Sequence, residues 1–244
     1  MVRMGLCCAR LVVAAAVMSV AAQATAAPVI GIQIDSLGGG YAGYSTSQEG
    51  SANPDGTFGL KGFVDGATYG TSFDCDWSIV VNEDPQITST FTLTNISGVN
   101  QTFIMTVTLP IAALGPSTLR GGYVGLSGSG TTYTDSNANG NVQFSANPFY
   151  QALVNGILSQ GLGNYNVNSS ISGTLPQDSW GTPIPSAPFG SASVNMQIKW
   201  QFSLSSGDSV STQGFFQVEK APEPAAFGLM GLGLAVLAAA RRLV

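Results

Sequence analysis

Alternation of apolar and polar residues is the feature that most restricts how this chain can fold. The run from Val194 to Leu204 places an apolar side chain at every second position, with five polar residues between them. Successive side chains of a β-strand point to opposite sides, so this period of two predicts a strand with one buried and one solvated face.

The same alternation recurs along much of the chain. It marks the segments 73–81, 87–94, 102–109 and 210–218, and a loop at 95–100 is expected to join the second and third of these as a hairpin. Many short strands with one polar face are typical of antiparallel sheets that pack face to face. The sequence therefore predicts an all-β fold, a single antiparallel β-sandwich for which a jelly-roll arrangement is one candidate.

One segment departs from the alternation. Asn147 and Pro148 precede apolar residues at helical spacing, and Gly161 and Gly163 follow them. Asparagine is a favourable N-cap and proline is tolerated in the first turn of a helix. We therefore expect one short amphipathic helix in the sandwich, over residues 147–158.

Residues 1–26 have the pattern of a secretory signal peptide. Two arginines precede a largely apolar run at 11–20, and Ala24-Thr25-Ala26 fits the small-x-small cleavage rule. The run is short for a span of ~20 residues, which favours cleavage over a retained anchor. Signal peptidase and the secretion machinery are thus expected partners, and the mature chain is expected to begin at Ala27.

The other end, residues 221–244, has three parts in a fixed order. Pro222-Glu223-Pro224 precedes 16 residues without a charge at 225–240, and Arg241-Arg242 follow. As a helix the uncharged stretch would be roughly 24 Å long, which is thin for a hydrocarbon core of ~30 Å. The sequence predicts a marginal transmembrane helix whose basic stop, at 241–242, lies on the cytoplasmic side.

This order of triplet, apolar helix and basic stop resembles the PEP-CTERM sorting signal of Gram-negative bacteria. The resemblance covers residues 222–244 together with the signal peptide. It implies that exosortase, a membrane protease, recognises the tail and removes it while the chain is transiently held in the inner membrane. It also implies a destination at the outer surface or in the exopolysaccharide matrix of a biofilm. A simple C-terminal anchor is the alternative interpretation.

Composition excludes several functions for the segment between these ends, the expected extracellular domain at 27–220. The chain has no histidine, which excludes histidine-based catalytic triads and imidazole metal ligands. The domain has 12 acidic and 4 basic side chains, a net charge of −8, so it is not expected to bind nucleic acid. Cys75 is its single cysteine, and we expect a buried thiol without catalytic activity.

A partial calcium motif occurs at Asp135-Ser136-Asn137-Ala138-Asn139-Gly140. Asp135, Asn137 and Asn139 have the alternate spacing of a calcium loop, but Ala146 stands where the bidentate glutamate belongs. The alternative is a hairpin turn at Asn139-Gly140. The sequence offers calcium as the one candidate cofactor, and otherwise none is expected.

Acidic residues are densest between positions 74 and 84. Asp74, Asp76, Glu83 and Asp84 could hold calcium beneath a loop or supply the carboxylate pair of a glycosidase. The alternative is the solvated face of an acidic protein.

Of the three tryptophans, Trp180 is the candidate for binding a glycan. Trp77 and Trp200 alternate in register with the apolar residues of their predicted strands and are expected in the core. Trp180 lies in a proline-rich segment expected to be a loop. An exposed aromatic ring can stack on a sugar, with Asp178 and Gln177 as hydrogen-bonding neighbours. The alternative is a loop that covers one end of the sandwich.

Two rows of threonine complete the candidates. Thr88, Thr90, Thr92 and Thr94 form one row, and Thr102, Thr106 and Thr108 form another. If the two strands are paired, the rows lie side by side on one exposed face and could bind ice or a crystal surface. Threonine is also an ordinary residue on the solvated face of a strand.

Taken together, these patterns favour an exported, non-enzymatic protein of the cell surface or extracellular matrix, associated with exopolysaccharide. A carbohydrate-binding module, with or without calcium, is the alternative. A glycan-active enzyme and an ice-binding surface rank below both.

Overall fold

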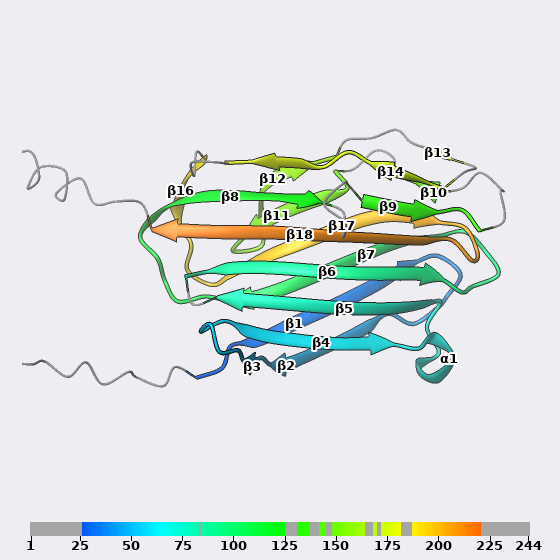
Figure 1. Cartoon of the computed structure of the whole chain (residues 1–244), viewed down its shortest axis with the longest axis horizontal. Helices are drawn as coiled ribbons and strands as arrows, with labels where there is room; N and C mark the ends of the chain where they lie inside the picture. The colour runs from blue at the N-terminus through cyan, green and yellow to red at the C-terminus, as the bar shows by residue number, and fades with distance from the viewer. Residues whose placement is uncertain are drawn as a thin grey trace, which may run out of the picture.

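The computed structural model describes residues 26–82, 84–124, 131–136, 142–144, 148–163, 168–169, 172–181 and 187–220. Over this part of the chain two antiparallel sheets lie face to face, sheet II in front and sheet I behind (Figure 1). Rings from the two sheets meet between them, as where Phe91 and Trp200 lie 5.0 Å apart between centroids. The predicted all-β, antiparallel architecture is confirmed.

Sheet I has the strand order β12-β11-β17-β7-β1-β2, with β10 and β13 attached beside β17. Its strands are β1 (Val29–Leu37), β2 (Tyr44–Glu49), β7 (Gln101–Pro110), β10 (Val142–Gln143), β11 (Tyr150–Val154), β12 (Ile157–Leu162), β13 (Asn168–Ser169) and β17 (Asn195–Leu204).

Sheet II has the order β14-β9-β18-β6-β5-β4-β3, and β8 pairs with β18 and with β15 and β16. Its strands are β3 (Ser51–Ala52), β4 (Phe58–Val64), β5 (Phe73–Asn82), β6 (Gln86–Asn95), β8 (Pro116–Val124), β9 (Thr131–Thr134), β14 (Gly173–Leu175), β15 (Asp178–Trp180), β16 (Ala187–Ser191) and β18 (Ser209–Lys220). Strands β4, β5 and β6 are sequential neighbours, so this part of the sheet is a meander and lacks the alternating order of a jelly roll.

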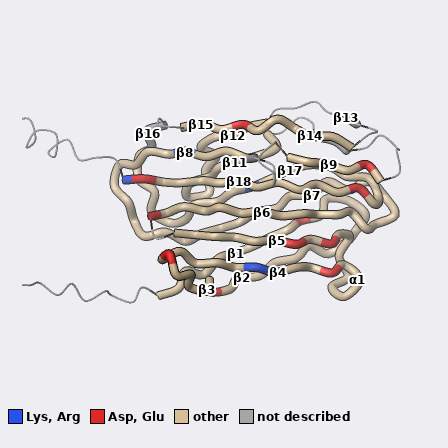
Figure 2. The backbone as a smooth tube through the Cα atoms, viewed as in Figure 1, with Lys and Arg blue, Asp and Glu red and all other residues tan. Residues whose placement is uncertain are grey.

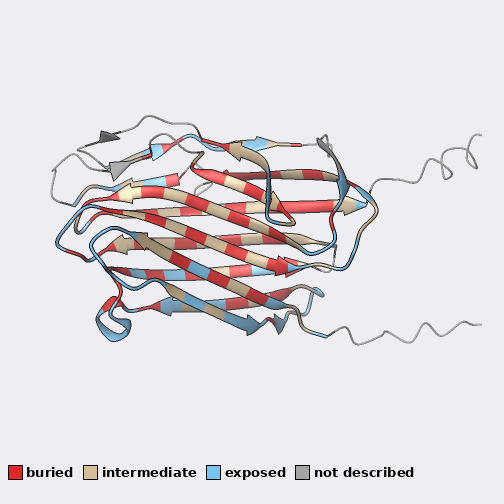
Figure 3. Cartoon of the chain, turned by 180° about the vertical axis from the view of Figure 1, so that it is seen from behind, coloured by how far each residue is buried: buried red, intermediate tan, exposed pale blue. Residues whose placement is uncertain are grey.

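The alternation in the sequence becomes the alternation of burial along each strand, visible as bands in Figure 3. In β17, for example, Met196, Ile198 and Trp200 are fully buried, while the residues between them are part-exposed. Trp77 is also buried, as expected. All the described strands, and the core between them, lie within residues 29–220.

The hairpin expected between β6 and β7 is wrong, because these strands belong to different sheets. The connection between them crosses from sheet II to sheet I around the fully buried side chain of Asn95. Its amide donates to the carbonyls of Leu204 at 2.8 Å and Val99 at 2.9 Å, and its oxygen accepts from the Ser97 backbone N–H at 2.9 Å. These bonds hold the chain in a crossover where the sequence pattern suggested a simple turn.

The helix expected at 147–158 is also wrong over its described part, which forms the hairpin of β11 and β12. The turn is Asn155-Gly156, with φ of 55° and 76°, the left-handed conformations that favour these two residue types. Pairing with β17 fixes β11 as a strand, because it buries Tyr150, Ala152 and Val154 on one face. The short helix of the described chain is α1 (Gly66–Tyr69), capped by the Asp65 side chain.

The two ends of the described chain leave the sandwich on the same side, where β1 begins and β18 ends (Figure 1). No helix within the described ranges is long and apolar enough to cross a membrane. Residues 1–25 of the predicted signal peptide (1–26) and the predicted transmembrane helix at 225–240 lie outside the described residues.

Candidate functional site

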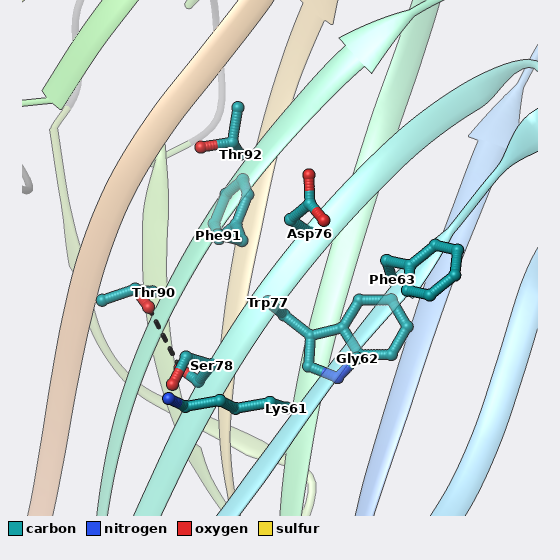
Figure 4. Close-up of a pocket in the computed structure, with 9 residues that line it drawn as sticks. All are labelled: Lys61, Gly62, Phe63, Asp76, Trp77, Ser78, Thr90, Phe91 and Thr92. Carbon is teal, nitrogen blue, oxygen red and sulfur yellow. Dashed lines mark hydrogen bonds between the residues drawn. The ribbon is translucent and has the colours of Figure 1, made fainter.

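The candidate site is a hollow of about 510 Å³ over the outer face of sheet II (Figure 4). Three adjacent strands, β4, β5 and β6, each contribute three consecutive positions to its lining. We call this the outer hollow; it is lined by Lys61, Gly62, Phe63, Asp76, Trp77, Ser78, Thr90, Phe91 and Thr92.

Strand register explains which side chains gather there. Phe63 lies opposite Asp76, and Asp76 lies opposite Thr92 on the next strand. Lys61, Ser78 and Thr90 form the parallel row beside them. Side chains alternate along a strand, so Lys61 and Phe63 point outward because Leu60 and Val64 are buried.

The middle position of each strand forms the floor of the outer hollow. Trp77 is only 6% exposed, and its ring packs under Gly62 and beside Tyr44, at 5.7 Å between ring centroids. A Cβ at Gly62 would lie 2.5 Å from the Trp77 ring, so the close approach requires glycine at this position. The indole therefore supports the floor from inside the sandwich and leaves the outer surface open.

Phe63 is the unusual residue of the outer hollow. Its side chain is 64% exposed, and the other outward-pointing side chains that line the outer hollow are all polar. Figure 4 shows its ring standing beside Asp76, at the edge formed by β4. A large apolar group exposed at a rim of polar side chains is a feature of interaction sites.

The charged groups beside Phe63 remain available to a ligand. The one ion pair between two described residues joins Arg120 and Glu219 at 3.3 Å, so Lys61 and Asp76 do not pair with each other or with any other described residue. Thr90 donates to the backbone carbonyl of Ser78 at 3.2 Å, which orders one side of the outer hollow. The site thus presents an aromatic face, a carboxylate acceptor, an ammonium donor and hydroxyls.

These four kinds of group match the chemistry of a carbohydrate. The C–H face of a pyranose stacks on an aromatic ring, and its hydroxyls both donate and accept hydrogen bonds. The volume of the outer hollow lies within the ~300–1,000 Å³ of small-molecule sites. An open hollow on a sheet face suits a segment of a polymer better than a small ligand that must be enclosed.

The acidic residues singled out in the sequence are not gathered into one site. Asp76 faces the outer hollow, whereas Asp74 accepts the Gly66 backbone N–H at 2.9 Å and so holds α1 in place. Asp84 lies in the turn beyond the opposite end of β5, and Glu83 is outside the described residues. Within the described ranges no three acidic, cysteine or histidine side chains form a group that could hold a metal.

The predicted calcium loop is described only at its start. The Ser136 backbone N–H donates to Asp208 at 3.0 Å, and the same fully buried carboxylate accepts from the Ser205 hydroxyl at 2.5 Å. These contacts tie the residues after β9 to the turn between β17 and β18. Asp135 is part-exposed, and the other predicted ligands, Asn137 and Asn139, lie outside the described residues.

Trp180 does not stand on an exposed loop as expected. It ends the short strand β15, pairs with Gly121 of β8, and lies part-buried with its ring 6.1 Å from that of Phe216. The surrounding prolines concealed a three-residue strand from the sequence pattern. Gln177 is exposed, while Asp178 accepts the adjacent Ser179 backbone N–H at 2.9 Å.

The two threonine rows do not lie side by side. Thr88, Thr90, Thr92 and Thr94 belong to β6 on the outer face of sheet II, while Thr102, Thr106 and Thr108 belong to β7 in sheet I. Because the crossover at Asn95 separates the strands, the rows lie on opposite outer faces of the sandwich. The combined threonine surface expected from the sequence is therefore absent.

Cys75 is buried beneath the outer face of sheet II, with 1% of its surface exposed. Burial raises the pKa of its thiol far above the ordinary value, and the nearby Asp76 carboxylate raises it further. A thiol held in its protonated form is a poor nucleophile. The expected burial is confirmed.

Comparison with protein-family models matches residues 220–242 to the PEP-CTERM protein-sorting motif. This range contains the triplet Pro222-Glu223-Pro224 and the two arginines Arg241 and Arg242, and it confirms the resemblance found in the sequence. No curated protein matches the chain. The motif indicates an exported protein that exosortase sorts and processes.

Proposed function

We propose that this chain is a non-enzymatic protein of the cell surface or extracellular matrix that binds exopolysaccharide through the outer hollow. The observation that carries the proposal is the exposure of Phe63, whose side chain is 64% exposed among the polar side chains of the outer hollow and lies directly opposite Asp76. The sorting motif supports it because sorting by exosortase accounts for how the domain is exported. The proposal transfers the carbohydrate-binding role expected at Trp180 to a different aromatic residue.

The distribution of carboxylates favours binding over catalysis. A glycosidase needs two carboxyl groups roughly 5–10 Å apart across one sugar linkage. Among the acidic residues that the structure describes, Asp76 alone lines the outer hollow. One carboxylate beside an aromatic ring can orient a sugar, but it does not supply both an acid and a base.

Co-sedimentation with the producing organism's own exopolysaccharide tests the proposal. Residues 27–220, which contain every described strand, are mixed with the polymer in the presence of calcium or EDTA. We expect the wild-type domain to pellet in both conditions and Phe63→Ala to remain in solution. Ile157→Ala is a matched control, since Ile157 is 65% exposed on β12 of sheet I.

Two results would reject polysaccharide binding at the outer hollow. One is a wild-type domain that stays in solution, and the other is Phe63→Ala pelleting as well as wild type. The surface location is tested separately by cell fractionation and the intact mass of the protein. Recovery of the domain from the inner membrane with residues 221–244 still attached would contradict it.

A further inference from the structure

The outer hollow continues into a longer row of side chains that crosses sheet II. Strand register aligns one outward residue from each of five adjacent strands, β4, β5, β6, β18 and β9. We call this row the cross-strand track; it consists of Phe63, Asp76, Thr92, Ser211 and Thr132. With neighbouring strands ~4.8 Å apart, the row extends over about 19 Å.

Beyond Asp76 the cross-strand track consists of small hydroxyl side chains. The Thr92 and Ser211 hydroxyls are hydrogen-bonded to each other at 2.7 Å, which makes the row continuous between β6 and β18. Thr132 is exposed at the far end. Such a row forms a continuous polar surface along which a polymer rich in hydroxyl groups can lie.

Polar side chains border the cross-strand track on both sides. Lys61, Ser78, Thr90 and Gln213 form the row on one side. Asp74, Thr94, Ser209 and Thr134 form the row on the other side. A chain bound over Phe63 and Asp76 can therefore find donors and acceptors along its whole length.

Charge restricts the kind of polymer. Residues 27–220 have a net charge of −8, and Lys61 is the one cation in the three rows. An acidic domain repels a polyanion over the range of the screened Coulomb interaction. Stacking on Phe63 and hydrogen bonding to hydroxyls need no charge on the ligand.

We infer that sheet II binds an uncharged polysaccharide that lies across its strands, with one sugar stacked on Phe63 and the chain extending toward Thr132. The inference rests on the proposed binding of exopolysaccharide and adds the direction, length and charge class of the bound segment. Neither Trp180 nor the partial calcium motif takes part in it.

Size-fractionated fragments of the same exopolysaccharide test the inference, with the dissociation constant of each length measured by titration calorimetry. We expect affinity to rise with length until a fragment extends over about 19 Å and then to level off. Phe63→Ala is expected to weaken every length by about tenfold or more, as loss of an aromatic anchor does. Thr132→Val is expected to weaken only the long fragments, by roughly twofold to tenfold.

Thr106→Val is the control, because Thr106 is part-exposed on β7, on the outer face of sheet I. If the shortest binding fragment binds as tightly as the longest, and Thr132→Val matches wild type at every length, the cross-strand track is rejected. In that case loss of co-sedimentation in Phe63→Ala still supports the proposed function. A wild-type domain that does not pellet with the polymer would reject both.

Discussion

The two outer faces of the sandwich have similar residue patterns but differ in which side chains remain available to a ligand. Both carry rows of threonine and glutamine between buried apolar positions, and charged residues are sparse along the middle of most strands (Figure 2). On sheet I the polar side chains bond to one another: Gln197 donates to Thr108 at 3.0 Å, and Thr102 and Ser203 lie 2.7 Å apart. On sheet II a carboxylate, an ammonium group and an exposed aromatic ring gather around the outer hollow, and none of them has such a partner among the described residues.

This difference shows that a polar sheet face is not by itself a binding site. The hollow on sheet I has about half the volume, 270 Å³ against 510 Å³, and its lining contains no aromatic residue. An aromatic ring supplies apolar contact that water cannot replace, while the polar groups beside it provide orientation. We therefore assign binding to sheet II and a mainly structural role to the face of sheet I.

The largest expected effect comes from breaking the crossover that sends β6 and β7 to opposite faces. Asn95→Ala leaves the buried Ser97 N–H and Leu204 carbonyl without this partner, while the Val99 carbonyl still accepts from the Ser97 hydroxyl. We expect a loss of about 3 kcal/mol in the free energy of unfolding, because each orphaned polar group costs roughly 1–3 kcal/mol. Urea denaturation measures it, and an unchanged midpoint would contradict the role of Asn95.

Two glycines in β4 allow the packing beneath the outer hollow to be tested against a matched control position. Gly62→Ala forces a Cβ against the Trp77 ring, whereas Gly59→Ala places one 3.4 Å from the Asn53 side chain. We expect Gly62→Ala to destabilise the domain by about 1–3 kcal/mol, as overpacking does, and Gly59→Ala to cost less. Equal unfolding midpoints for the two variants would show that Trp77 does not support the floor.

Replacement of one carboxylate on each face sharpens the comparison. Asp76→Asn keeps the shape of the side chain and removes the charged acceptor of the outer hollow, so polysaccharide affinity is expected to fall about fivefold. Asp35→Asn on β1 of sheet I, where the carboxylate accepts from Gln33 at 3.0 Å, should leave affinity unchanged. Calorimetry with the same polymer fragment distinguishes the two, and a larger effect of Asp35→Asn would reverse the assignment of faces.

Calcium is expected to have the smallest effect. The outer hollow contains a single carboxylate, too few oxygen ligands for a cation that takes six to eight. Affinity with calcium and with EDTA should therefore agree within about twofold. A loss of binding in EDTA would instead direct attention to Asp135 and the residues that follow it.

The strands were largely predictable, because burial of one sheet face requires an apolar residue at every second position of a strand. The long alternating runs became β5, β6, β7 and β17 with the expected buried faces, and the run at 210–218 became β18. Pairing partners were not predictable in the same way, since Asn95 to Asn100 has the composition of a turn and its role as a crossover depends on contacts with β17. The hairpin of β11 and β12 was missed although Asn155-Gly156 is a strong turn signal.

The candidate site was predictable only in part. The alternation places Asp74 and Asp76 on the solvated face of their strand, and both are exposed; the threonines of β6 are part-exposed. Phe63 was overlooked because β4 alternates weakly, with glycine at two of its seven positions, and because its exposure depends on the register with β5. Trp180 is the aromatic residue that the sequence pattern favours, because it lies among prolines typical of a loop. The pattern does not reveal that its ring packs against Phe216.

Chemical-shift mapping tests the central assignment most directly. An isotope-labelled domain of residues 27–220 is titrated with a fragment of the producer's exopolysaccharide, and the backbone amide shifts are followed on both faces at once. We expect shifts concentrated at 61–63, 76–78 and 90–92, the three segments that line the outer hollow. Shifts concentrated on β1, β7 and β17 of sheet I, with these three segments unmoved, would contradict that assignment.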